Sequence, residues 1–369
     1  MRLIIDARYT RYGFHDGISR YTASLLEALK KLHDEQHPLC ADLEIIMAIS
    51  DIRQLKMLPD MDYILVSSPT NIREPFIART LNKYHPDVVF SPMQTIGSWG
   101  KKFHLILTLH DLIYYEHPTP PSFLPRPIQW GWRLFHRSYT PQRLLLNRAD
   151  AVATVSQTSA QLIRQHHLTK KPLHIIPNAA ATGSIVSEEQ AQDRIAHRQK
   201  TLLYMGSFME YKNVETLMIA MKDLPEYRLL LLSRISEQRQ QELHQYVTDN
   251  IEFCYGVSDE EYQQLLATST ALLTASRAEG YGLPVVEAQA QGCPVVISDI
   301  DIFHEIAPHG LHCNPEDPQA FVQAIRTLEN TAHYQQVVRE GLRDAQRFSW
   351  KESALQLLNV ATNMTRANT

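Results

Sequence analysis

The sequence of 369 residues lacks most of the features that mark a secreted, membrane-spanning or nucleic-acid-binding protein. Its four cysteines are far apart and form no Cys-x-x-Cys pair, which predicts buried free thiols and a reducing cytoplasm. No apolar run is long enough to cross a bilayer, and the first residues lack the long apolar core of a signal peptide. The formal net charge is only −4, so no nucleic-acid partner is expected.

Two cofactor motifs are also incomplete. Gly280 and Gly282 match the start of the dinucleotide-binding fingerprint, but Val285 stands where its third glycine belongs, which disfavours a nicotinamide cofactor. The seventeen histidines include no His-x-x-x-His pair beside a glutamate base, which disfavours a zinc site. Asp299 and Asp301 have the spacing of a metal-binding acidic pair, but we interpret them as the ordinary cap of a helix that starts there. Neither a metal nor another cofactor is therefore expected.

Apolar segments alternate with helical ones along the whole chain. The helix predicted from Ile18 to about Leu32 carries its large apolar residues on one stripe. Many of the predicted strands are apolar throughout, as expected when helices cover both faces of a parallel sheet. Those in the first half lie at residues 3–7, 44–49, 62–67, 87–91, 105–109, 151–155 and 173–177.

The composition changes after residue 178, where the sequence becomes poor in large apolar side chains, and we place a domain boundary there. The alternation then restarts, with strands predicted at residues 202–205, 228–232, 251–254, 271–275 and 295–298. Two consecutive series of this kind predict an α/β chain with two doubly wound domains that face each other across a cleft. We assign residues 1–180 to the first domain, residues 181–347 to the second, and residues 348–369 to a C-terminal helix.

Two carboxylates bracket the most informative segment, which runs from Glu279 to Glu287. A buried strand precedes it and a helix follows, so Glu279 is expected at the strand exit and Glu287 in the first helical turn. Ligands bind there in doubly wound sheets, and carboxylates can accept hydrogen bonds from sugar hydroxyls while repelling phosphate. The pair therefore suggests a nucleotide sugar, with hydroxyls at both ends and phosphate in the middle. The alternative is a tight loop with one surface glutamate and one helix-start glutamate.

Two cations follow strands of the second domain. Lys212 comes after the strand that ends near Gly206 and directly before a helix, so a positive charge and free N–H groups are expected together. Arg234, at the exit of the strand at residues 228–232, lies on the same predicted rim and is a candidate second cation. The combination predicts an anion site, whereas an isolated lysine would be no more than a solvated charge.

Two positions at strand exits of the first domain complete the candidate site. Gly17 opens the first helix, and a glycine there permits close approach of a phosphate to the backbone. His110 ends an apolar strand at the expected edge of the cleft, which favours a role in the site over a histidine satisfied by the local backbone.

Residues 101–148 are unusually basic, with seven cations and two acids, a local charge of 7 − 2 = +5 in a chain of −4. If the segment forms one helix, an aromatic stripe would lie beside a basic one. The aromatic stripe would hold Ile128, Trp132, Phe135 and Tyr139. The basic stripe would hold Arg126, Trp130, Arg133 and Arg137. This pattern suits an anionic membrane surface or a lipid-phosphate acceptor. The alternative is a helix with its aromatic residues in the core and its arginines in water.

Taken together, these motifs resemble glycosyltransferase family 4, the retaining transferases of GT-B architecture. The resemblance covers nearly the whole chain, and the segment between Glu279 and Glu287, with Gly-x-Gly-Leu-Pro inside it, is its most specific part. The other motifs lie, in chain order, at residues 16–21, 110–111, 149–156, 176–179, 206–213 and 348–350. The family fold implies two Rossmann-like domains facing a cleft, the first on the acceptor side and the second binding the nucleotide sugar. It also implies that the last helix crosses back to pack on the first domain.

The resemblance also implies roles for individual residues. Glu287 would hold the ribose hydroxyls, Glu279 the hydroxyls of the donor sugar, and Lys212 would neutralise the departing diphosphate. His110 would contact the donor sugar near the reacting carbon. One departure is that Ser207 stands where family members often have an arginine, and we take Arg234 as its substitute. The implied donor-binding positions also include Gly17, Gly206, Ser207, Arg234, Tyr255, Val257, Gly280, Tyr281, Gly282 and Leu283.

The activity implied by the family is transfer of a hexose, with retained anomeric configuration and without a metal, from a nucleotide diphosphate sugar to a glycan or lipid-linked acceptor. GDP-mannose is the first candidate donor because the chain is similar to bacterial mannosyltransferases of cell-surface polysaccharide synthesis; a UDP sugar is the alternative. A catalytically silent nucleotide-sugar-binding subunit is a second hypothesis. The expected location is the cytoplasm, with contact to the inner face of the cell membrane through residues 126–148.

Overall fold

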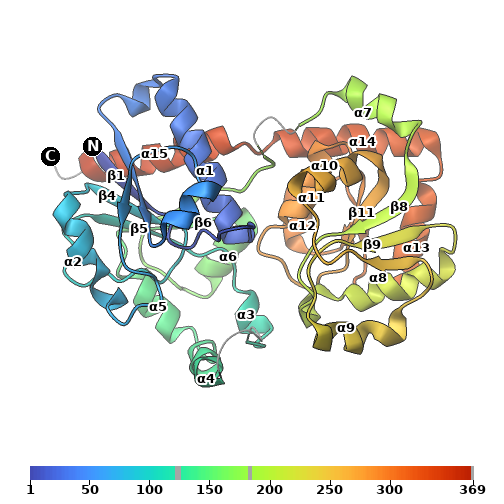
Figure 1. Cartoon of the computed structure of the whole chain (residues 1–369), viewed down its shortest axis with the longest axis horizontal. Coiled ribbons are helices and arrows are strands. Elements are labelled where there is room, and N and C mark those ends of the chain that lie inside the picture. The colour runs from blue at the N-terminus through green and yellow to red at the C-terminus, as the bar shows by residue number, and fades with distance from the viewer. Residues whose placement is uncertain (121–125, 182–184, 367–369) are drawn as a thin grey trace. The chain divides into compact units, whose positions relative to one another are not determined.

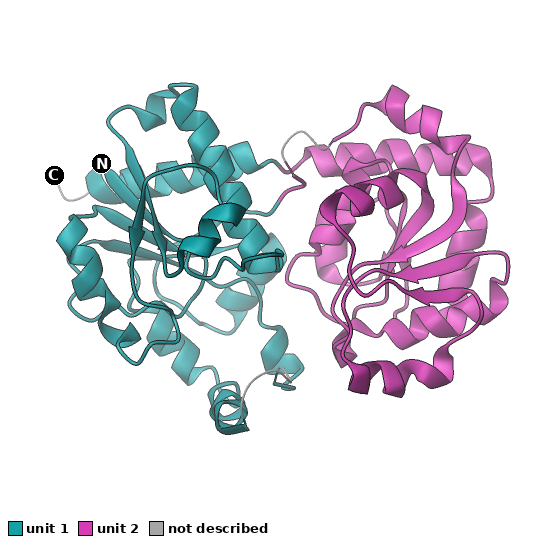
Figure 2. Cartoon of the chain, viewed as in Figure 1, with its two compact units in different colours: residues 1–178, 349–369 teal, residues 179–348 magenta. Residues whose placement is uncertain are grey.

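The computed structural model describes residues 1–120, 126–181 and 185–366 and divides the chain into two compact units (Figure 2). Unit 1 contains Met1–Asn178 together with Ser349–Thr369, and unit 2 contains Ala179–Phe348. Each unit is built around one parallel sheet with its own hydrophobic core. None of the helices in the described segments is long and apolar enough to cross a membrane.

Unit 1 is built on a seven-stranded sheet in the order β3-β2-β1-β4-β5-β6-β7, in which every neighbouring pair is parallel. Side chains on both faces of its central strands are buried, which explains why these strands are apolar throughout rather than alternating. The strands are β1 (Arg2–Asp6), β2 (Glu44–Ile49), β3 (Tyr63–Leu65), β4 (Val88–Ser91), β5 (His104–Thr108), β6 (Ala151–Thr154) and β7 (Leu173–Ile175).

The helices of unit 1 include the last helix of the chain, which packs against the first (Figure 1). The indole of Trp350 meets the ring of Tyr21 edge to face at 5.5 Å, and the Ser353 hydroxyl donates to the Pro177 carbonyl at 2.7 Å. The predicted first helix is confirmed as α1. The helices are α1 (Gly17–Asp34), α2 (Ile77–Leu81), α3 (Ile113–Glu116), α4 (Arg126–Phe135), α5 (Thr140–Leu146), α6 (Gln157–Gln165) and α15 (Trp350–Arg366).

Unit 2 has a six-stranded parallel sheet in the order β10-β9-β8-β11-β12-β13. Its strands are β8 (Gln199–Tyr204), β9 (Arg228–Leu231), β10 (Ile251–Phe253), β11 (Ser269–Thr274), β12 (Val295–Ser298) and β13 (Leu311–Cys313). Its helices are α7 (Glu188–Ile195), α8 (Val214–Ala220), α9 (Glu237–Leu243), α10 (Asp259–Thr268), α11 (Leu283–Ala290), α12 (Asp301–Ile306), α13 (Pro318–Thr327) and α14 (Thr331–Gln346). The strands predicted from the sequence are confirmed in both units, and β13 is an addition.

Each sheet has one point at which the direction of chain progression reverses. In unit 1 this switch point lies between β1 and β4, because β2 and β3 extend the sheet from β1 in the opposite direction. In unit 2 it lies between β8 and β11. Ligands of doubly wound sheets bind outside the carboxyl ends of the strands at this point. A ligand site of unit 2 is therefore expected at the segments that leave β8 and β11.

Candidate functional site

Lys212 and Glu279 meet at the switch point of unit 2. Lys212 lies in the segment that leaves β8, and Glu279 lies in the segment that leaves β11. The Lys212 Nζ atom is 2.6 Å from Glu279 Oε1, and the two side chains are only 14% and 13% exposed. The sequence places both residues at strand exits, and the structure brings them into direct contact. Water screens a charged pair with this little exposure only weakly, so both charges interact strongly with a ligand bound beside them.

The Lys212 segment is held by Arg277, a residue that belongs to no motif of the sequence. Lys212 ends a short 3-10 helix, and Asn213, with a φ of 50°, turns the chain into α8. The Arg277 guanidinium donates to the Glu210 carbonyl and to Asn213 Oδ1, both at 3.0 Å, and so fixes this turn. Glu316 in turn accepts from Arg277 at 2.5 and 2.8 Å. Arg277 is therefore a positioning residue, and its only signal in the sequence is a cation close to Glu279.

Glu279 is also fixed by hydroxyl groups of its own segment. The Ser276 hydroxyl donates to Glu279 Oε1 at 2.8 Å, and the hydroxyls of Ser276 and Thr274 are 2.9 Å apart. One carboxylate oxygen thus receives both an ammonium and a hydroxyl group. This pre-organises the side chain before a ligand arrives, since its rotamer is already set.

The segment between Glu279 and α11 needs glycine at position 282. Gly282 has a φ of 99°, and a Cβ atom there would lie 2.7 Å from Phe303 Cε1. Among the described residues no side chain caps the start of α11, so N–H groups of its first turn are available to an anion. The sequence predicts Glu287 in the first turn, but α11 begins at Leu283, which places Glu287 in the second turn. Glu287 is 7% exposed.

Other predicted donor-binding residues of unit 2 lie at the exits of β8, β9 and β10. The Gly206 N–H donates to Ser233 Oγ at 3.1 Å, and the Ser207 carbonyl accepts from the Tyr204 hydroxyl at 2.6 Å. Arg234 packs along the next loop, since a Cβ atom on Gly256 would lie 3.2 Å from its Nε atom. Tyr255 of that loop is exposed and its hydroxyl accepts from Gln240 at 2.7 Å, while Val257 is half-buried.

His110 lies directly after β5 in unit 1, beside the switch point. Its Nε2 atom is 2.8 Å from the Pro92 carbonyl oxygen, so we assign the proton of the neutral ring to Nε2, which leaves Nδ1 as an acceptor. Burial lowers the pKa of His110 below its ordinary value of 6.5, against the smaller opposing effect of this hydrogen bond. His110 is therefore a neutral hydrogen-bonding group at pH 7.

The start of α1 is a poorer phosphate site than the sequence predicts. Gly17 is its first residue, but Asp16 caps the helix, with its Oδ1 atom accepting from the Ser19 N–H at 2.9 Å. Arg11 donates to the other carboxylate oxygen at 2.8 Å. A carboxylate already neutralises this helix end, and it would repel a phosphate that approached Gly17.

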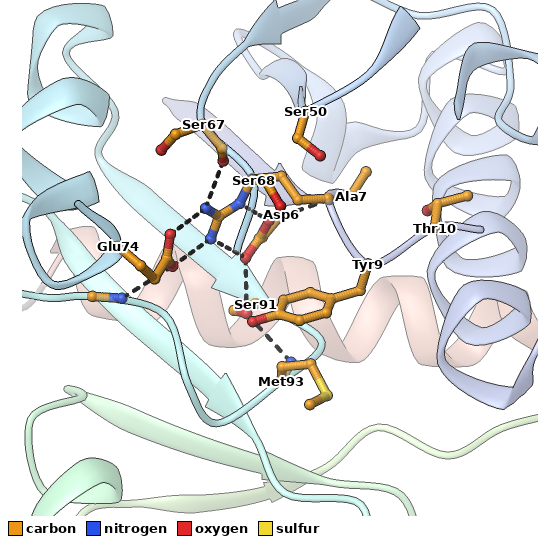
Figure 3. Close-up of polar contacts among 12 residues, drawn as sticks. Asp6, Ala7, Tyr9, Thr10, Ser50, Ser67, Ser68, Glu74, Ser91 and Met93 are labelled. Atoms are coloured by element: carbon orange, nitrogen blue, oxygen red, sulfur yellow. Dashed lines mark hydrogen bonds and ion pairs between the residues drawn. The ribbon is translucent and has the colours of Figure 1, made fainter. Parts of the chain in front are cut away.

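A buried ionic network occupies the carboxyl end of β1 in unit 1 (Figure 3). Arg8 donates from Nε to Asp6 Oδ1 at 2.7 Å and from Nη2 to Asp6 Oδ2 at 3.1 Å. It also donates from Nη1 and Nη2 to the two carboxylate oxygens of Glu74, at 2.7 and 2.8 Å. Ser67 supplies a carbonyl acceptor at 3.1 Å and Ser91 a hydroxyl donor to Asp6 at 3.2 Å. Three segments of unit 1 are joined here by one guanidinium.

The interpretation of Asp299 and Asp301 as a helix cap is wrong. The residue at the cap position of α12 is Ile300, and no described side chain makes a capping hydrogen bond there. Asp299 instead lies 2.6 Å from His304 Nε2, and the His304 ring stacks on the His312 ring at 4.2 Å with only 6° between their planes. These three side chains are the described group with the spacing of metal ligands, and Asp301 is not part of it. Two parallel rings cannot direct their lone pairs at one ion unless one of them turns.

The basic and aromatic segment is not one helix. α4 ends at Phe135, and Tyr139 precedes α5, whose second position is Pro141. None of the described side chains of α4 is buried, which also contradicts the alternative with its aromatic residues in the core. Trp130 is 69% exposed and lies near exposed apolar and basic residues of α4 and its end, which are Ile128, Leu134, Arg126, Arg133 and Arg137.

Comparisons with known proteins agree with the two units. The family model described as Glycosyltransferase Family 4 matches residues 15–183, and the model described as Glycosyl transferases group 1 matches residues 186–344. The chain is 25% identical over 328 residues to the O-antigen chain mannosyltransferase RfbU of Salmonella typhimurium (strain LT2), covering 85% of this chain and 87% of that protein.

Two further similarities span nearly the whole chain. It is 23% identical over 394 residues to the O-antigen chain mannosyltransferase B of Escherichia coli, covering 98% of this chain and 99% of that protein. Among solved structures, the sucrose-phosphate synthase of Thermosynechococcus elongatus superposes with a TM-score of 0.75 at 20% identity, covering 99% of both chains. At this identity the structural match shows a shared fold.

Proposed function

The chain belongs to glycosyltransferase family 4 and has the GT-B fold, and from this we propose that it transfers mannose from GDP-mannose to a hydroxyl of a glycan or lipid-linked acceptor. The contact between Lys212 and Glu279 at the switch point of unit 2 carries the proposal, because it joins a cation for the diphosphate to an acceptor for sugar hydroxyls. The names of the two bacterial relatives support mannose as the transferred sugar.

The proposed reaction retains the anomeric configuration and needs no metal. The acceptor oxygen bonds to the anomeric carbon, the bond from that carbon to the diphosphate oxygen breaks, and the departing phosphate oxygen takes the acceptor proton. Lys212 and the N–H groups at the start of α11 stabilise the charge that develops on the diphosphate. Glu287 holds the ribose and Glu279 the donor sugar, and neutral His110 accepts a hydrogen bond from a sugar hydroxyl.

The donor can be identified by thermal unfolding of the whole protein with GDP, UDP and ADP and with a sugar nucleotide of each. GDP-mannose is expected to give the largest rise in Tm, because a ligand that binds only the folded state stabilises it by ~2.7 kcal/mol at 100 times its Kd. A larger rise in Tm with a UDP sugar would identify that sugar nucleotide, and not GDP-mannose, as the donor.

Excess EDTA should leave sugar transfer unchanged. If EDTA abolished the activity and Mn²⁺ restored it, the metal-independent mechanism would be contradicted.

A catalytically silent, nucleotide-sugar-binding subunit is the second candidate function. It would share the Tm response but would never cleave the donor. Slow release of free sugar from the donor in the absence of an acceptor, followed by liquid chromatography, separates the two functions, since only an enzyme breaks the bond to the anomeric carbon.

We also propose that α4 contacts an anionic membrane surface. Exposed Trp130 and Leu134 can insert between headgroups while exposed Arg133 and Arg137 pair with phosphates. The protein should float with vesicles that contain phosphatidylglycerol but not with phosphatidylcholine alone, and the double change Trp130→Ser and Leu134→Ser should abolish flotation. Ile72→Ser, which alters a 92% exposed residue elsewhere, is the matched control. Unchanged flotation of the double variant would exclude α4 as the contact.

A further inference from the structure

A small pocket lies beside His110 in unit 1, at the carboxyl ends of β4 and β5. It has a volume of about 110 Å³, and the residues that shape it include Met93, His110, Tyr114, Tyr115, His136 and Gln142. It adjoins the switch point between β1 and β4, where a doubly wound sheet binds its ligand. The volume is well below the ~300–1,000 Å³ of pockets that enclose drug-sized ligands, so it suits one sugar ring rather than several.

Two buried polar groups of this pocket have no hydrogen-bond partner within the described residues. Gln142, on α5, is 1% exposed, and its side-chain amide nitrogen finds no acceptor there. The hydroxyl group of Tyr115, on α3, is also buried and has no hydrogen-bond partner among the described residues. Polar groups buried in this way destabilise a fold, and each needs an explanation. A ligand with hydroxyl groups would supply partners for both.

The chemistry of the pocket selects against anionic ligands. Its described lining contains neither lysine nor arginine but does contain the carboxylate of Asp111, so a phosphate would meet a like charge and no countercharge. Aromatic rings form much of the wall: the ring of His136 lies edge to face with Tyr114 at 5.7 Å and with Tyr115 at 5.1 Å. Apolar ring faces with a few fixed polar groups are what binds a compact, neutral, hydroxyl-bearing molecule.

We propose that this pocket is the acceptor subsite and takes an uncharged sugar ring at the end of a glycan. Gln142 and Tyr115 pair with hydroxyls of that ring and set the specificity for it. The proposal rests on the proposed glycosyltransferase function and narrows its acceptor class, from glycans or lipid phosphates to neutral glycan ends. His110, which the family resemblance places against the donor sugar, also lines this pocket.

The first test is Gln142→Leu, a change of similar volume that removes the unpaired amide nitrogen. Because that nitrogen has no described hydrogen-bond partner, the Tm should stay the same or rise, whereas Gln54→Leu should lower it. Gln54 is the matched control because it is also buried but donates to three carbonyls, those of Ala7, Arg8 and Thr10. The KM for the acceptor should rise about 10- to 100-fold in Gln142→Leu, and hydrolysis of the donor without acceptor should be unchanged.

The outcomes of this variant separate the possible roles of the pocket. A fall in donor hydrolysis that matches the fall in transfer would assign the pocket to the donor sugar and overturn the proposal. Unchanged transfer would also overturn it. A lower Tm with unchanged KM would make Gln142 a structural residue.

A second test uses neutral and anionic probes on the wild-type protein. Methyl α-D-mannopyranoside, methyl β-D-galactopyranoside and mannose 1-phosphate are compared by saturation-transfer-difference NMR. At least one neutral glycoside should bind the wild type and lose its signal in Gln142→Leu; stronger binding of mannose 1-phosphate would overturn the neutral class. If donor hydrolysis occurs but no neutral glycoside binds, only this inference fails. If no sugar nucleotide binds or reacts, the proposed function itself fails.

Discussion

Replacing Lys212 by alanine should lower the rate of sugar transfer about 30- to 1,000-fold, which corresponds to ~2–4 kcal/mol of lost transition-state stabilisation. The reason is the charge that builds on the diphosphate as it departs. Lys212 is held near the start of α8 by the Arg277 contacts to Glu210 and Asn213, so its ammonium is in place before the reaction begins. The loss should appear mostly in kcat, because the interaction strengthens as the bond to the anomeric carbon breaks.

The pairing with Glu279 sharpens this expectation. In the free protein the Lys212 ammonium is bound to Glu279 at 2.6 Å, and a bound donor would compete for it with its phosphates. Removing Lys212 therefore also leaves a poorly exposed carboxylate with only the Ser276 hydroxyl as its described donor. Steady-state kinetics with the donor of the Tm panel measures the effect, and Lys222→Ala, at an exposed lysine of the same unit, is the control. Wild-type turnover by Lys212→Ala would remove this residue from the mechanism.

The local parts of this fold could be predicted from the sequence, because their signals are local. Strands such as β2 and β12 contain continuous apolar runs, and helix α1 carries one apolar stripe. β13 could not be found in this way, since it has three residues and includes His312. The break between α4 and α5 was hidden because the aromatic and basic residues continue across it.

The candidate site could be predicted only as far as strand exits. The sequence places Lys212 and Glu279 each after a strand of the second domain, but their contact depends on β8 and β11 being neighbours across 64 residues of intervening chain. Arg277 and Gln142 belong to no sequence motif. Arg277 is identified by its hydrogen bonds to the Lys212 segment, and Gln142 by a buried amide nitrogen that has no described hydrogen-bond partner. Long-range pairing and buried polar groups without partners are properties of the folded chain, so no window of sequence contains them.

A different kind of loss is expected from Arg8→Ala, which should destabilise the protein by ~3–5 kcal/mol. Arg8 is buried, and its guanidinium is shared by the carboxylates of Asp6 and Glu74. Without it, two acids with little access to water remain close together, and neither has another described cation. For a unit of this size the Tm should fall by roughly 6–20 °C, measured by calorimetry or circular dichroism. Arg53→Ala, at an exposed pair with Asp51, should leave the Tm almost unchanged.

Further variants separate the charge of this network from its geometry. Arg8→Lys keeps the charge but cannot make parallel hydrogen bonds to two carboxylates, so most of the loss should remain. Adding Asp6→Asn and Glu74→Gln to Arg8→Met should recover part of the lost stability, because no uncompensated buried charge is left. If the triple variant were no more stable than Arg8→Ala, the effect would come from packing alone.

The Ser91 hydroxyl that donates to Asp6 also accepts from the Met93 N–H, so the network reaches the wall of the pocket beside His110. Arg8→Ala should therefore also weaken acceptor binding, while donor binding in unit 2 is retained.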